Sequence, residues 1–161
     1  SKSILFQKET RISLVKALVN LEIGNIDLAE KCLEGILGSE KVFDITFEVV
    51  WANIIMARIM YQGRSKFDLC LDYTKKALSL AKEIKFNHFW IALCYLVLGS
   101  RNLPNCEFNL SLKHHLKSIV IFRKIKNNWF IAAALNNIGA IYSTIGDYDL
   151  ALKYYQESLN Q

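Results

Sequence analysis

The feature that most constrains how this chain folds is a pattern that recurs four times along its 161 residues. In each copy a bulky residue is followed by Asp or Asn, then by Leu, then by a small residue. The small residues lie 41, 41 and 40 positions apart. They are Ala29, Cys70, Ser111 and Ala151, and the bulky residues three positions before them are Ile26, Phe67, Phe108 and Tyr148. An internal period of this length indicates stacked copies of one supersecondary unit.

The last copy, residues 132–159, indicates what that unit is. Apolar residues recur at helical spacing on both sides of a short break at Gly146 and Asp147. Gly146 can take the left-handed conformation that ends a helix, and Asp147 can cap the helix that follows. The pattern therefore predicts two helices joined by a tight turn. We expect the small residues Gly139 and Ala151 to face each other across it, because larger side chains would hold the helices apart.

This last copy resembles a tetratricopeptide repeat, through Gly139, Tyr142, Gly146, Ala151 and Tyr155. The observed period is longer than the 34 residues of the common form of that repeat. It is similar to the long-period form of kinesin light chains, of cell-polarity adaptors and of many prokaryotic signalling regulators. The resemblance implies an all-α fold, an α-α superhelix (solenoid) of four helical hairpins with about eight helices.

We expect residues 1–161 to form a single repeat domain. The turn of the second repeat, at 62–66, has one extra residue, and Pro104 makes the turn of the third repeat firm. No polar capping helix follows Leu159, so we expect a fragment of a longer protein or an end that packs on something else. The predicted repeats cover about residues 3–40, 41–87, 88–128 and 129–161.

The composition narrows the class of protein. Hydrophobic residues make up 52% and charged residues 22%, and a single proline favours long helices over a many-stranded sheet. The formal net charge of +5 favours an acidic partner but is too small to indicate nucleic acid by itself. The four cysteines show no C-x-x-C spacing, so we interpret them as buried free thiols.

The most apolar run, residues 89–99, is too short to span a membrane, and no signal peptide is visible. We therefore predict a buried core helix for that run and a cytoplasmic protein.

The resemblance also implies where a partner would bind, since the first helices line the concave groove in that family. An asparagine that grips a peptide backbone through its paired donor and acceptor matches Asn137, but Val15, Ile55 and Val97 stand at the equivalent positions. A clamp for a C-terminal carboxylate is therefore not reproduced. The predicted groove residues are Arg11, Trp51, Ile54, Arg58, Tyr61, Leu93, Leu96, Ser100, Asn136 and Asn137.

A histidine pair and a basic stretch could each have a structural or a functional role. His114 and His115 are adjacent and share no helix face, and His115 falls at the packing position that Tyr155 fills in the last repeat, so we expect no metal site. Residues 108–146 contain no acidic residue but four lysines and one arginine. We interpret this stretch as a solvated convex face, with an acidic protein or phosphate as the alternative.

No catalytic constellation or Gly-rich phosphate loop occurs, so we expect no enzyme and no cofactor. The predicted function is a protein-interaction scaffold whose groove binds a segment of a partner protein or peptide, with no nucleic acid and no membrane. One alternative is a peptide- or ligand-sensing domain of a larger prokaryotic signalling or transcriptional regulator. Another is self-association as a homodimer through the uncapped C-terminal repeat, at Tyr155 and Leu159.

Overall fold

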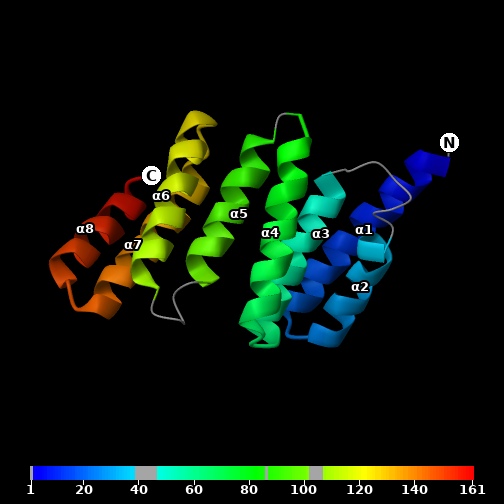
Figure 1. The fold of residues 1–161 in the computed structure, drawn as a ribbon, viewed down its shortest axis with the longest axis horizontal. Coiled ribbons are helices and arrows are strands. Elements are labelled where there is room, and N and C mark those ends of the chain that lie inside the picture. The colour runs from blue at the N-terminus through cyan, green and yellow to red at the C-terminus, as the bar shows by residue number, and fades with distance from the viewer. Residues whose placement is uncertain (1, 39–46, 86, 102–106) are drawn as a thin grey trace. The chain divides into compact units, whose positions relative to one another are not determined.

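The computed structural model describes residues 2–38, 47–85, 87–101 and 107–161. These residues form eight α-helices and one π-helical turn, and the described ranges contain no strand (Figure 1). The all-α prediction is confirmed. The helices divide into two compact units, residues 1–85 and 86–161.

The first unit contains two helical hairpins. Helix α1 packs on α2, both pack on α3, and α3 packs on α4. A π-helical turn, η1, continues α3 and contacts α2 and α4. The elements are α1 (Lys2–Glu22), α2 (Ile26–Gly38), α3 (Phe47–Arg58), η1 (Ile59–Gly63) and α4 (Phe67–Glu83).

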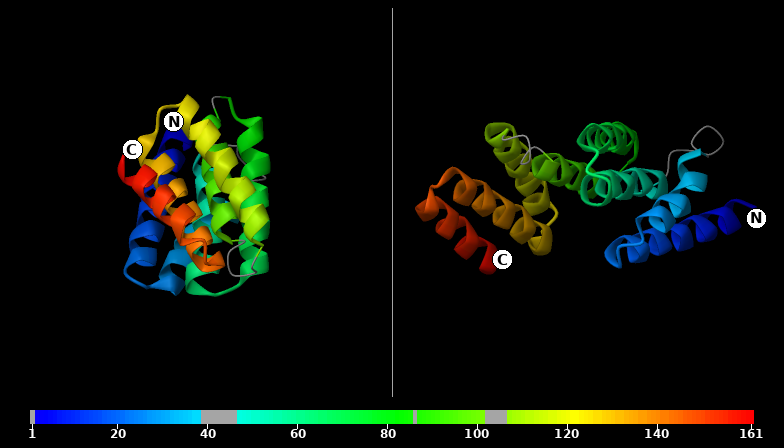
Figure 2. Two further views of the ribbon diagram at one scale, coloured as in Figure 1. Left: turned by 90° about the vertical axis from the view of Figure 1, so that its left-hand side faces the viewer. Right: turned by 90° about the horizontal axis from the view of Figure 1, so that it is seen from below.

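The second unit also contains two helical hairpins. Helix α5 packs on α6, α6 on α7, and α7 on α8. Its core gathers buried side chains of three helices, with the rings of Phe122 and Phe130 stacked at 4.9 Å. The tight turn between α7 and α8 is visible in Figure 2. The elements are α5 (His88–Arg101), α6 (Phe108–Lys124), α7 (Asn128–Ile145) and α8 (Tyr148–Leu159).

The second helix of every hairpin begins at its predicted bulky residue. These first residues are Ile26, Phe67, Phe108 and Tyr148, so the 41, 41 and 40 residue spacing of the sequence is also the spacing of the helices. The small residue three positions later is buried in all four second helices. The repeat pattern therefore predicted the register of the fold.

The turns of the first and last hairpins have the predicted chemistry. Gly24 and Gly146 have φ values of 84° and 92°, in the left-handed region where a Cβ would be strained. The N–H of Asp147 donates to the Tyr142 carbonyl at 2.9 Å, which closes a Schellman motif. The Asp147 side chain accepts from the Leu150 N–H at 3.1 Å, as predicted for the cap of α8.

The extra residue of the second repeat is taken up by η1. A π-helical turn holds one residue more than an α-helical turn, and the Arg64 N–H donates to the Ile59 carbonyl at 3.1 Å, five residues back. Gly63 ends η1 directly against Ile26 of α2, since a Cβ on Gly63 would lie 2.7 Å from the Ile26 Cδ1. Because the insertion is absorbed here, α4 still begins at its predicted residue.

Three of the four cysteines lie in the described residues, and all three are free thiols. Cys70 and Cys94 are buried, as predicted, whereas Cys32 is only half-buried. Burial raises the pKa of Cys94 to about 12, so this group stays a neutral thiol. The predicted turn at Pro104 and the fourth cysteine, Cys106, lie outside the described residues.

The close approach within the hairpins of the second unit is made by a glycine and a ring. A Cβ on Gly99 would lie 2.6 Å from the His115 ring, and a Cβ on Gly139 would lie 2.7 Å from the Tyr155 ring. The atoms nearest to Gly139 belong to the ring of Tyr155, four residues after Ala151, and the predicted facing of Gly139 and Ala151 stays a prediction. The prediction that His115 and Tyr155 occupy the same packing position is confirmed.

This contact predicts opposite effects for two glycine-to-alanine substitutions. Gly99→Ala should lower the free energy of unfolding by about 1–3 kcal/mol, because the His115 ring is fully buried and has no room to move. Gly35→Ala in α2 meets nothing within 4 Å and should stabilise by about 0.5–1 kcal/mol. Urea denaturation of both variants tests this, and equal shifts would contradict the glycine–ring contact.

Candidate interaction surfaces

The predicted groove residues of the first unit differ in how much of their surface is exposed. Ile54 is only 3% exposed, so it has almost no surface to offer a partner. Trp51 and Tyr61 are half-buried. Tyr61 meets the ring of Phe67 edge to face at 5.7 Å, and burial, followed by the nearby Cys70, raises the pKa of its hydroxyl.

Both predicted groove arginines form ion pairs between α1 and α3. The Arg11 Nε donates to Glu48 Oε1 at 2.8 Å, and the Arg58 Nη2 donates to Glu22 Oε1 at 2.8 Å. The sequence predicts Arg58 as a charge offered to a partner. In the structure Glu22 already balances that charge, although both side chains keep contact with solvent.

The predicted residues of the second unit also divide. Leu96 is 9% exposed and Leu93 is half-buried, and both pack in the core of that unit. Ser100 and Asn137 are half-buried, and the Asn137 Nδ2 donates to the Ser100 Oγ at 3.3 Å. Asn136 is exposed. The structure thus brings Ser100 and Asn137 together and leaves Asn136 open to solvent.

These contacts share one register. The partners in Arg11–Glu48, Glu22–Arg58 and Ser100–Asn137 are 37, 36 and 37 residues apart. The small residues of neighbouring first helices, Ala17 and Ala57 or Gly99 and Gly139, are 40 apart. Neighbouring first helices in each unit are therefore offset by three or four residues, which is about one helical turn.

The two predicted self-association residues differ in exposure. Tyr155 is half-buried, because its ring lies on Gly139 within its own hairpin. Leu159 is 87% exposed. Tyr148 and Leu152, which the sequence pattern did not single out for this role, are also exposed. The spacing of 148, 152 and 159 places these three side chains on one face of α8.

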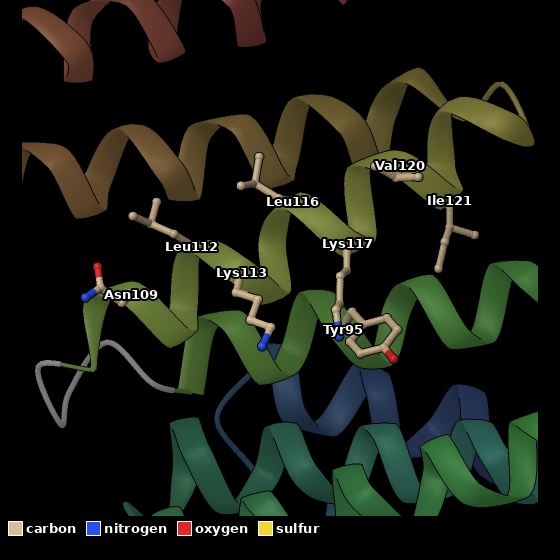
Figure 3. Close-up of a pocket in the computed structure, with 8 residues that line it drawn as sticks. All are labelled: Tyr95, Asn109, Leu112, Lys113, Leu116, Lys117, Val120 and Ile121. Carbon is tan, nitrogen blue, oxygen red and sulfur yellow. The ribbon is translucent and has the colours of Figure 1, made fainter.

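One surface of the second unit was not predicted from the sequence. It is a shallow groove of about 740 Å³ along α6 with Tyr95 of α5 at one side (Figure 3). We refer to it as the α5–α6 groove. Asn109 and Ile121 lie at its two ends, and its remaining lining residues are Tyr95, Leu112, Lys113, Leu116, Lys117 and Val120.

A sequence signal for this groove existed. Leu112, Leu116 and Val120 recur at intervals of four residues, which marks a helix face. It is distinct from the buried face of α6, which contains Ser111, His115, Ser118 and Phe122. The lysines of this helix are conspicuous in the sequence, whereas the exposed apolar row beside them is apparent only in the structure.

Residues 105–161 match the sequence model of the family described as tetratricopeptide repeat. This part of the chain, about a third of its length, is similar to the tetratricopeptide-repeat family. The resemblance found in the sequence is confirmed, and the matched residues contain the α7–α8 hairpin. Tetratricopeptide repeats generally mediate protein–protein interaction and are typically non-enzymatic scaffolds.

Solved structures extend the shared fold to nearly the whole chain. BtubC (BKLC) from P. vanneervenii has a TM-score of 0.77 and 19% identity over 94% of this chain. The match spans 62% of the length of that protein. Two structures of MamA have TM-scores of 0.63 and 0.53, with 21% and 18% identity, over 99% and 96% of this chain and 82% and 92% of theirs. At these identities the likeness concerns the fold alone.

No curated protein sequence gives a significant match to the chain. Within the described ranges, no helix combines the length and the apolarity needed to cross a lipid bilayer. The same residues bring together no group of three His, Cys, Asp or Glu side chains that could hold a metal ion.

The buried His115 predicts a pH dependence of stability. Burial, and then the neighbouring His114, lowers the pKa of His115 from 6.5 to about 4. Between these values the unfolded chain binds a proton that the folded chain does not, so stability falls as the pH falls below about 6.5. From pH 7.5 to pH 5 this group should cost about 2 kcal/mol of unfolding free energy.

Urea denaturation at both pH values, compared between His115→Leu and the parent chain, measures this contribution. The pH effect should be smaller in His115→Leu than in the parent chain, because the buried imidazole is removed. His114 titrates beside Lys113 and Lys117, and burial, then Lys117 and Lys113, lowers its pKa. His114→Gln therefore separates its share. An equal pH effect in His115→Leu and the parent would contradict the assignment.

Proposed function

We propose that the chain is a protein-interaction scaffold that binds an extended segment of a partner protein along its first helices. The observation that carries this is the polar cluster of the second unit, where Asn137 donates to Ser100 at 3.3 Å beside the exposed Asn136. An amide side chain offers both donors and an acceptor, which matches the N–H and C=O of a peptide backbone.

The surroundings of this cluster support recognition of a backbone rather than of large side chains. Ala133 and Ala140, which flank the two asparagines on α7, are half-buried and small, so a bound chain can approach closely. The bond to Ser100 restricts the Asn137 rotamer before any ligand arrives, which lowers the entropy cost of binding. Ile54 and Leu96 are buried, so the proposed contacts do not include them.

A selection of random peptides on the immobilised chain, followed by fluorescence anisotropy on those selected, tests this function. Replacing both asparagines, Asn136→Ala with Asn137→Ala, should weaken the dissociation constant about tenfold, since each lost hydrogen bond is worth about 0.5–1.5 kcal/mol. Gln156→Ala removes an exposed amide from α8 and should leave the affinity unchanged. Peptides that bind equally to both variants, or no binding peptide at all, would refute this binding mode.

A second candidate function is self-association through α8. It is favoured by the exposed face of Tyr148, Leu152 and Leu159, because adjacent apolar side chains on one exposed helix face are typical of an interface. The occupant of that face would be a second copy of the chain. Tyr155 does not count as an interface residue, since its ring lies within its own hairpin.

Light scattering over a hundredfold range of concentration distinguishes the two candidates. If α8 is an interface, the mass should rise with concentration, and Leu152→Glu with Leu159→Glu should return it to that of a monomer. A matched control makes the same apolar-to-acidic change at the same seven-residue spacing on another helix, with Ile12→Glu and Val19→Glu. A constant monomer mass in the parent chain would rule out self-association.

A further inference from the structure

The exposed row on α6 is apolar. Leu116 and Val120 are 49% and 54% exposed, and Leu112 is half-buried beside them. Another face of the same helix packs into the unit, with His115, Ser118 and Phe122 fully buried. Helix α6 thus exposes two apolar side chains, Leu116 and Val120, beside its buried face, and Leu112 borders both because it also packs against the core of the unit.

A basic edge runs along this row. Lys113 and Lys117 extend toward α5, whereas Leu112 and Leu116 point away from it (Figure 3). The Lys117 Nζ lies 5.2 Å from the centre of the Tyr95 ring, a cation–π contact that restricts this flexible side chain. The two lysines are four residues apart, so their Cα atoms are separated by about 6 Å along the helix.

The charged side chains that line the groove are all positive. None of its lining residues carries a carboxylate, and residues 108–146 contain no Asp or Glu. The ring of His114 stacks on Tyr95 at 6.0 Å. Burial lowers the pKa of His114, and the positive charges of Lys117 and Lys113 lower it further. Glu157, which approaches α6 from α8, pairs with Arg123 at 3.1 Å and not with the groove lysines.

We propose that the α5–α6 groove binds an acidic amphipathic helix of a partner protein. The apolar ridge of that helix lies on Leu112, Leu116 and Val120, and carboxylates spaced one turn apart meet Lys113 and Lys117. A helix is favoured because the apolar row and the basic edge both repeat every four residues, as one face of a partner helix does. This surface is separate from the asparagine cluster, so either can fail without the other.

An anionic membrane is the alternative ligand for this groove, because it also combines negatively charged headgroups with an apolar interior. Membrane-surface helices carry Trp or Phe on a protruding apolar face. Here the apolar row lies in a shallow groove, and its single aromatic residue, Tyr95, is half-buried against Lys117 and His114. The geometry therefore favours a protein helix.

The test uses a synthetic 18-residue helical peptide with Leu on one face and Glu beside it, titrated into the full chain by fluorescence anisotropy. The first control is a scrambled peptide of the same composition, which cannot place its leucines on one face. The second carries Lys in place of Glu. The acidic amphipathic peptide should bind at least about tenfold more tightly than either control, and less tightly as salt rises.

Charge reversal in the groove locates the site. Lys113→Glu with Lys117→Glu should weaken binding about tenfold, and Leu116→Ser with Val120→Ser should do so as well. Lys124→Glu with Lys153→Glu makes the same change in net charge at exposed positions outside the groove and should weaken binding less than about twofold. Asn136→Ala with Asn137→Ala should have no effect. Circular dichroism checks that each variant is folded.

Several results would overturn the proposal. Equal losses in the groove and control lysine variants would indicate non-specific attraction between opposite charges. No binding of the acidic peptide at about 1 mM would leave the groove without this ligand. Sedimentation with vesicles of phosphatidylserine and phosphatidylcholine, lost in Lys113→Glu with Lys117→Glu while the peptide fails to bind, would assign the groove to a membrane instead.

Discussion

The contact on which the hairpins of the second unit depend is a ring lying directly on a glycine of the facing helix. His115 covers Gly99 and Tyr155 covers Gly139, with no space for a Cβ in either case. This brings the helices of a hairpin close enough for the Ser111 hydroxyl to donate to the Gly99 carbonyl at 2.7 Å. The same proximity buries an imidazole with no hydrogen bond to its ring nitrogens from any described residue. Close packing of the backbone is thus obtained together with an unsatisfied polar ring.

Contacts between neighbouring first helices follow a second rule, the offset of about one turn. It applies to the ion pairs of the first unit and to the amide–hydroxyl bond of the second. The residues that make these contacts are the polar ones on the first helices. Four of the polar residues predicted to contact a ligand, Arg11, Arg58, Ser100 and Asn137, therefore also join two repeats, and in them the two roles compete for the same side chains. Arg58 illustrates this, since it is shared between Glu22 and solvent.

Much of the fold could be predicted from the sequence, because the residues that recur in each repeat are of types that favour one local structure. A small residue three positions after a bulky one, and Gly146 before Asp147, specify a helix start and a turn whatever surrounds them. Burial could not be read in this way. Ile54 and Leu96 lie on first helices, as a groove residue should, yet they face the cores of their units. Which apolar row of α6 is covered depends on how α5 and α7 pack, so Leu116 and Val120 were missed.

The π-helical turn at Ile59–Gly63 has a consequence for how such a chain can change over evolution. An insertion inside a helix normally rotates every later side chain by about 100° and moves its apolar face out of the core. Here the added residue is confined to one wide turn, and Phe67 starts its helix as in the other repeats. A repeat can therefore gain one residue at the end of its first helix without changing how its second helix packs. Repeats of 40 and 41 residues can follow one another in one array, and the hairpin tolerates drift in length where a continuous helix would not.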